Sequence, residues 1–399
     1  MDKHDQGHSA PFESLCLTRD GWGQVRLTNG RRASFFLGPD QVPGSGAIDS
    51  WTYWPAGSVL RVRTTRGDEV DVELPQPGAP APVRNRPSIY LDQNHWSTLT
   101  NAIHQPSRIR DPGERRAAAA LIDLARNKEV VLPLSVAHMT ETVQQCDARQ
   151  RYQRALTMAQ LSSGWHLRDA LDVRVCEIQQ MLSRRYRGMD VQPRLVVTLE
   201  PVAMLDSRLA RDTMDPALIE DFGEELALAY QSILAATCDL DVVLGTRQVP
   251  MNPIPGWARS FMDFAAFLQA DPTGPEMKRR RTHAKFVADL RLELATAVHQ
   301  SGIRVDQMSD WTLSHSEGDI RTLPALGLYR EVMHEKLCNP ALRWEDNDLT
   351  DMMFLSVGAG YCNQTVAERS HAAHLQRSQQ RLGREASVHR HLRGLLERL

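Results

Sequence analysis

The chain lacks the sequence features that define several common protein classes. Its 399 residues contain no run of about 18 apolar residues, so no transmembrane helix is expected. The opening residues, Met1-Asp2-Lys3-His4, include no apolar segment typical of a secretory signal. The six cysteines are scattered without a Cys-x-x-Cys pair, which argues against a zinc ribbon and for a reducing compartment. We therefore expect a cytoplasmic protein that does not bind membranes.

Several catalytic motifs are also missing. There is no Gly-x-Ser-x-Gly, no His-Glu-x-x-His and no Gly-x-x-x-x-Gly-Lys-Ser/Thr, so a serine hydrolase, a zinc protease and a P-loop nucleotidase are not supported. An aspartyl-phosphate phosphatase begins with Asp-x-Asp, whereas this chain has Asp92-Gln93-Asn94 and lacks the second carboxylate. Catalysis, if present, must therefore use other residues.

Lysine is scarce, with five among the 47 Lys and Arg residues, and the net charge of −2 does not by itself indicate a nucleic-acid binder. A coding bias towards arginine explains the general excess. Two local concentrations remain, Lys278–Arg281 and the segment after Arg369. Because arginine binds phosphate bidentately, both are candidates to follow a nucleic-acid backbone, the alternative being a solvated basic face. The predicted substrate-binding arginines are Arg279, Arg280, Arg281, Arg377 and Arg381.

The N-terminal part is predicted to be a separate β domain. Residues 1–13 are polar and expected to be disordered, and residues 14–75 alternate apolar and polar positions between turns such as Asn29-Gly30. A small antiparallel barrel or sandwich is the predicted architecture. Its aromatic residues are interpreted either as a surface that stacks on bases or as core and protein-partner contacts (Trp22, Trp51, Tyr53 and Trp54).

The remaining chain is predicted to be an α/β domain with a long helical interruption. A Pro-rich linker spans 76–87, and the domain covers 88–399. Short apolar strands are expected at 89–91, 129–135 and 364–368. Residues 147–340 are mostly helical in pattern, apart from a strand-like 195–199, and form the predicted insertion. A long helix is expected over 369–399.

Acidic residues recur at comparable places in the predicted elements. Asp92 follows the first strand, Glu141 lies on the helix after the second, and Glu368 ends the last. Asp348 and Asp351 are three apart at the start of a helix, so they share one face and repel unless a cation lies between them. Hard oxygen donors of this kind select Mg²⁺ or Mn²⁺. The sequence therefore predicts a metal site.

This order of acids resembles the PIN-domain-like nucleases, through Tyr90–Asn94, Leu134–Glu141 and Asn347–Met352. The resemblance covers roughly 87–145 and 341–370. It implies a parallel sheet between helices and Mg²⁺- or Mn²⁺-dependent cleavage of RNA or single-stranded DNA, RNA being favoured. It also implies a homodimer, and a toxin-like or defence role by analogy alone. The implied metal ligands and catalytic residues are Asp92, Glu141, Asp348 and Asp351, with Glu368 marginal, Asn363 a neutral candidate for the variable fourth acid and Asn94 at the substrate.

Two other interpretations stay open. The chain can be a non-catalytic module that binds nucleic acid or protein on a degenerate PIN-like scaffold, or a helical protein whose acids are all in salt bridges. His95, His104 and His138 near the acids, and the pair His371 and His374, are more typical of hydrogen-bonded structural histidines than of catalytic or metal-binding ones.

Overall fold

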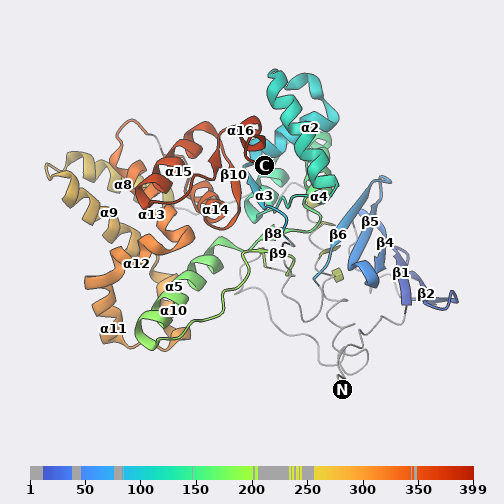
Figure 1. Cartoon of the computed structure of the whole chain (residues 1–399), viewed down its shortest axis with the longest axis horizontal. Coiled ribbons are helices and arrows are strands. Elements are labelled where there is room, and N and C mark those ends of the chain that lie inside the picture. Colours follow the sequence, from blue (N-terminus) through green and yellow to red (C-terminus); the bar gives the residue numbers. More distant parts are fainter. Residues whose placement is uncertain are drawn as a thin grey trace.

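The computed structural model describes residues 12–37, 46–75, 83, 85–145, 147–200, 256–342, 344–345 and 348–399, with short pieces at 203–204, 233–234, 236–237, 240–241 and 243–244. Its six-stranded antiparallel sheet lies at one side, a helical group lies at the other, and a small parallel sheet lies between them (Figure 1). The disorder predicted for residues 1–11, and most of the predicted linker 76–87, lie outside the described residues. Phe12 and Glu13, expected to be disordered, belong to the first strand.

The N-terminal strands form one open sheet rather than the predicted barrel or sandwich. The strand order is β3-β2-β1-β4-β5-β6, so within the described chain β3 and β6 are edges and do not pair with each other. One face is apolar because alternate residues of β5 and β6, such as Leu60 and Val72, point the same way and are buried. The strands are β1 (Phe12–Thr18), β2 (Trp22–Leu27), β3 (Arg32–Phe36), β4 (Ile48–Trp54), β5 (Val59–Thr64) and β6 (Glu69–Glu73).

The aromatic residues of this sheet divide between core and surface. Trp51 and Tyr53 on β4 are buried, in agreement with the core interpretation. Trp22 on β2 and Phe36 on β3 are each 56% exposed and lie with ring centroids 5.2 Å apart. Of the other predicted aromatic residues, Trp54 is partly exposed and lies beside Arg61, whose guanidinium is 5.6 Å from its ring centroid.

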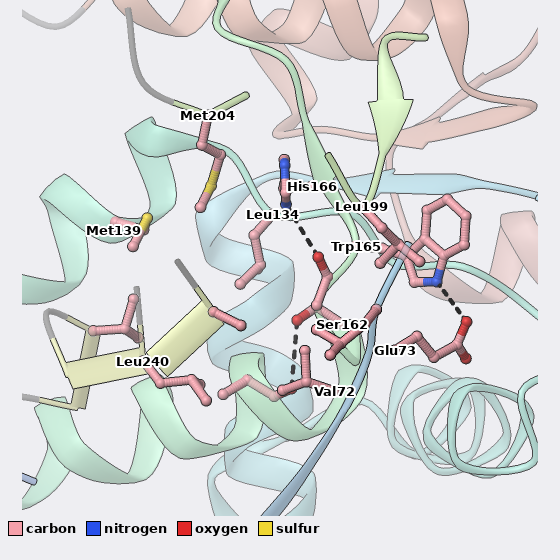
Figure 2. Close-up of a pocket in the computed structure, with 15 residues that line it drawn as sticks. Val72, Glu73, Leu134, Met139, Ser162, Trp165, His166, Leu199, Met204 and Leu240 are labelled. Carbon is pink, nitrogen blue, oxygen red and sulfur yellow. Dashed lines mark hydrogen bonds between the residues drawn. The ribbon is translucent and has the colours of Figure 1, made fainter. Parts of the chain in front are cut away.

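The sheet packs directly on the following domain. Glu73 at the end of β6 accepts hydrogen bonds from the Trp165 indole (3.0 Å) and from Arg86 (2.9 and 3.0 Å), and its backbone amide donates to the Ser163 carbonyl (2.8 Å). An apolar cavity of about 60 Å³ lies beside this contact. Figure 2 shows Val72 and Leu240 among the residues that line it. The N-terminal sheet therefore shares one core with the first helices that follow it.

A three-stranded parallel sheet lies at the centre of the second part. Its strands are β7 (Ile89–Leu91), β10 (Gln364–Val366) and β11 (Val388–His389), in the order β11-β10-β7. The strand expected at 129–135 is reduced to two isolated bridges, between Ser88 and Val131 and between Leu134 and His166. The strand-like segment 195–199 contains β9 (Val197–Thr198), which pairs with β8 (His166–Leu167) in a separate antiparallel pair.

The parallel sheet separates two hydrophobic cores. Ile89 and Leu91 face the core shared with the N-terminal sheet, whereas Tyr90 faces the core of the helical group. All three are at most 2% exposed. A strand buried on both faces reads as a continuous apolar run, which is why residues 89–91 were recognisable in the sequence.

Helices surround this sheet and build the larger group. Within the described chain no helix is both long and apolar enough to cross a membrane. Short helical turns occur at Pro55–Gly57, Pro106–Arg108 and Trp311–His315. The α-helices are α1 (Gln93–His104), α2 (Pro112–Arg126), α3 (Val136–Gln144), α4 (Ala148–Ser162), α5 (Ala170–Arg187), α8 (Trp257–Ala270), α9 (Pro275–Asp289), α10 (Arg291–Ser301), α11 (Val305–Asp310), α12 (Ser316–Thr322), α13 (Pro324–Cys338), α14 (Asp348–Tyr361), α15 (Arg369–Leu382) and α16 (Leu392–Leu396).

The long C-terminal helix predicted for 369–399 is wrong. Helix α15 ends at Leu382 because Gly383 adopts a left-handed conformation (φ 67°), which glycine accepts without steric cost. The chain then returns to the sheet as β11, beside β10, and finishes with α16. An arginine-rich helical pattern concealed this return because β11 has only two residues.

Helix α14 approaches β7 closely at a glycine. A Cβ on Gly358 would lie 2.5 Å from the ring of Tyr90, whereas a Cβ on Gly318 of α12 would meet nothing within 4 Å. We predict that Gly358→Ala lowers the free energy of unfolding by about 1–3 kcal/mol through overpacking. Gly318→Ala, the matched control, should be neutral or stabilising by up to about 1 kcal/mol. Urea denaturation of both variants checks this, and equal stability of the two would contradict the close packing of α14 on β7.

Candidate functional site

The parallel pairing brings Asp92 and Glu368 together at the carboxyl ends of β7 and β10. The backbone amide of Asp92 donates to the Val366 carbonyl, and the Glu368 amide donates to Asp92 Oδ2, both at 2.9 Å. Asp92 Oδ1 also caps α1 by accepting from the Asn94 amide at 3.1 Å. Asp92 therefore both begins a helix and joins the two strand ends, leaving less of its carboxylate free than the sequence suggested.

Glu141 lies on α3, and its position depends on the start of that helix. Ser135 and His138 form a reciprocal cap, in which the Ser135 amide donates to His138 Nδ1 at 3.1 Å. Burial, together with the charges of Asp351 and Asp92, raises the pKa of Glu141 to about 7, and Arg154 of α4 opposes this rise. Glu141 is thus a half-buried acid close to two others.

Asp351 faces the same group from α14. Burial raises its pKa to about 7, with further contributions from the negative charges of Asp92, Asp348 and Glu368, while Lys336 opposes them. Helix α14 contacts α3, β7 and β10, the elements that carry or precede the other acids. Helices α14 and α3 and strand β10 lie near the middle of the molecule (Figure 1). Three carboxylates that the sequence scattered over more than 250 positions therefore lie within electrostatic range of one another.

Asp348 differs from Asp351 because a lysine side chain already balances its charge. It forms an ion pair with Lys336 of α13, and both side chains are largely buried. Asp348 Oδ2 also accepts from the Glu345 amide at 2.5 Å, and His371 lies 4.0 Å from Oδ1. For Asp348 the salt-bridged interpretation of the acids therefore holds.

The donor chemistry of this acid cluster, defined here as Asp92, Glu141, Asp351 and Glu368, suits a hard divalent cation. All its members are carboxylates. Burial and mutual repulsion raise the pKa values of Glu141 and Asp351 to about 7. Burial and the charges of Asp92 and Glu345 also raise the pKa of Glu368. In the described part of the chain, however, no group of three or more His, Cys, Asp or Glu side chains is arranged to hold a metal ion. Side chains of the cluster must move to share one cation.

Two sequence-derived positions have other roles. Asn363 was a candidate for the fourth acid position, but it lies at the opposite, amino-terminal end of β10. There its Oδ1 accepts from the Ser88 amide (2.9 Å) and hydroxyl (3.0 Å), which fixes the register of β7 and β10. Its neutrality therefore says nothing about the acid cluster. Asn94 is exposed in the first turn of α1, next to Asp92.

Two of the candidate histidines are hydrogen-bonded as expected. His138 is buried, stacks on Tyr90 at 5.1 Å, accepts from the Ser135 amide and has its pKa lowered by burial to about 4, so it is neutral near pH 7. His374 pairs with Glu335 at 2.7 Å, and His371 faces Asp348. His95 differs, because in the described part of the chain its buried Nδ1 has no hydrogen-bond partner.

The predicted substrate-binding arginines are engaged within the chain. Arg279 pairs with Glu331 at 2.6 Å and with Glu317 at 3.5 Å, Arg280 with Glu276, and Arg281 with Asp271. On α15, Arg377 and Arg381 both pair with Glu335. Their charges are therefore largely balanced by neighbouring carboxylates.

Two cations lie beside the acids at positions that the sequence alone does not identify. Lys336 lies within the predicted insertion on α13, which packs against α14 and α15, and Arg154 lies on α4, which packs against α1 and α3. No motif marks either residue. The contacts between helices distant in the sequence are the only signal that identifies them.

No protein-family model, curated protein or solved structure matches this chain.

The electrostatics of the cluster lead to a stability prediction. Because the folded-state pKa of Asp351 (about 7) exceeds its ordinary value of 3.8, the folded protein retains this proton longer than the unfolded chain. The free energy of unfolding should therefore fall as pH rises from about 4 through 7. At pH 8 in EDTA, Asp351→Asn should raise it by about 1–3 kcal/mol.

Asp348→Asn provides the matched control. It removes the partner of Lys336 and should lower the free energy of unfolding at pH 8 by about 1–3 kcal/mol. Chemical denaturation at pH 4.5 and pH 8 measures both variants. If Asp351→Asn instead destabilises the protein at pH 8, the negative charge of Asp351 is balanced by a partner in solution and the prediction is wrong.

Proposed function

We propose that the protein is a metal-dependent nuclease on a PIN-like scaffold that hydrolyses phosphodiester bonds, with RNA as the favoured substrate. The observation that carries the proposal is the gathering of Asp92, Glu141 and Asp351 from three separate elements at the carboxyl end of a parallel sheet. Open α/β sheets bind their ligands at that end. Repulsion between these carboxylates destabilises the folded protein, and a bound cation would remove that repulsion.

Asp92 and Asp351 are the favoured ligands for Mg²⁺ or Mn²⁺, and Glu141 completes the set directly or through water. When bound, such an ion polarises a phosphoryl oxygen and lowers the pKa of water. Asp348, held by Lys336, positions the start of α14 and thereby Asp351. Glu368 lies at the exposed edge, where its amide donates to Asp92. The proposed contact to a substrate phosphate is Asn94, which follows Asp92 in the first turn of α1.

Without a cation, burial and the charges of Asp351 and Asp92 raise the pKa of Glu141 to about 7, while Arg154 restrains the rise. A cation bound between these acids would offset their repulsion and favour the ionised carboxylate. The proposed role of Glu141 is therefore to hold the cation directly or to orient a water molecule bound to it.

The proposal predicts a simple cleavage pattern. Purified protein should cleave labelled single-stranded RNA with Mn²⁺ or Mg²⁺ and not with EDTA. Asp92→Asn and Asp351→Asn should each reduce the rate by about a hundredfold or more. The matched control is Asp306→Asn on α11, an exposed acid whose partner is Arg304, and it should retain the rate. Equal activity in all three variants would refute the assignment and identify a contaminating nuclease.

A second function is favoured by one observation: in the described residues no three ligating groups are arranged to hold a metal. In that case the scaffold binds nucleic acid or protein without catalysis. A thermal-shift titration with Mn²⁺ separates the two. A stabilisation that Asp92→Asn abolishes favours the nuclease, and an unchanged melting temperature at millimolar Mn²⁺ favours the binding module.

A further inference from the structure

A second cavity lies near the acid cluster, between α1 and α4 and beside the C-terminal end of α3. Its volume is about 70 Å³, and every side chain that lines it is polar while none is acidic. It differs in this from the apolar cavity beneath the N-terminal sheet. A hollow of this size with amides and cations but no carboxylate suits a phosphate group.

Helix α1 supplies one wall of this polar cavity. Asn101 and His104 of α1 line it, together with Arg108 of the short turn that follows. Asn101 is seven residues, or roughly 10 Å, along the helix from Asn94 beside Asp92. Two turns separate Asn94 from Asn101, so both lie on a similar face. Partial burial lowers the pKa of His104, which keeps the imidazole neutral and able to both donate and accept. One face of α1 therefore connects Asn94, beside the acid cluster, with Asn101 in the polar cavity.

The opposite wall contains a polar atom without a partner. Gln145 follows Glu141 by one helical turn, and its Nε2 donates to Gln150 Oε1 at 3.0 Å. Among the described residues its Oε1 is buried and has no hydrogen-bond partner. Buried carbonyl oxygens are nearly always satisfied, so an unpaired one beside a cavity indicates a missing donor. A ligand bearing N–H or O–H groups would supply it.

The cations of the polar cavity are also available. Arg154 on α4 is half-buried, and Arg108 is exposed at the rim. In the described part of the chain neither is ion-paired with a carboxylate, although Glu141 acts on Arg154 at longer range. The five arginines of the basic stretches described above are ion-paired (Arg279, Arg280, Arg281, Arg377 and Arg381). Arg154 and Arg108 give the polar cavity positive charge that can bind a phosphate.

We propose that this polar cavity binds a backbone phosphate of single-stranded RNA, next to the nucleotide held at the acid cluster. Arg154 and Arg108 contact this phosphate, and the amides of Asn101, Gln145 and Gln153 hydrogen-bond to the adjoining ribose. This inference rests on the proposed nuclease function for the identity of the ligand. It adds a binding subsite to that function, on the α1–α4 side of the acids.

Binding is measured separately from cleavage to test this. A fluorescently labelled single-stranded RNA decamer is titrated with protein in EDTA, in the Asp351→Asn background, at several salt concentrations. Arg154→Gln should weaken binding five- to tenfold. Loss of one phosphate contact should also make the slope of log K against log salt shallower by about 0.7. Arg108→Gln, at an exposed position, should act in the same direction and covers the case in which the Arg154 variant fails to fold.

Arg116→Gln on α2 is the control, because it changes net charge equally at an exposed site outside the cavity. It should change affinity less than twofold. If Arg154→Gln and Arg108→Gln behave like this control, or if no RNA binds, the subsite is refuted. If RNA binding depends on Arg154 but the wild-type protein cleaves no RNA, the nuclease proposal is refuted and the subsite is retained. If the wild-type protein cleaves RNA but Arg154→Gln does not alter binding, the subsite is refuted and the nuclease proposal is retained.

Discussion

The pairing of β7 with β10 is the constraint on which the rest of the structure depends. The two strands are three residues long, and the residues they bring together, Asp92 and Glu368, are 276 positions apart. Parallel strands need a crossover connection, and here that crossover contains most of the helices. The register is held at one end by Asn363 on Ser88 and at the other by the Glu368 amide on Asp92. Because β7 is buried on both faces, a shift of one residue would put Tyr90 into the wrong core.

Charge is distributed unevenly around this sheet. The arginines most prominent in the sequence are neutralised by carboxylates within the helical group, such as Glu331 and Glu335. The acids at the strand ends are not neutralised to the same degree, and burial holds two of them near a pKa of 7. Stability alone does not favour that arrangement, since burial of a carboxylate without a partner is costly. Perturbed acids in such a position are a common property of functional sites.

The N-terminal sheet contributes to this arrangement indirectly. Its β6 edge is fixed by Glu73, which joins Arg86 and Trp165, and the shared core extends to α1 and α4. Those two helices form the walls of the polar cavity. The sheet is therefore part of the framework that positions α1 and α4, while its exposed Trp22 and Phe36 remain at the opposite edge.

The sequence by itself determined the local elements and the identity of the acids. The apolar run 89–91 followed by Asp92, the cap at Ser135 and the acidic first turn at Asp348 and Asp351 each depend on neighbours in the chain, and such signals can be read without a structure. Only the tertiary structure decided which charges face one another. It paired Asp348 with Lys336, paired the five candidate arginines of the basic stretches with carboxylates, moved Asn363 away from the acids and opened the polar cavity beside Arg154. Ion pairs and cavities arise between residues that lie far apart in the chain, and no local pattern encodes those distances.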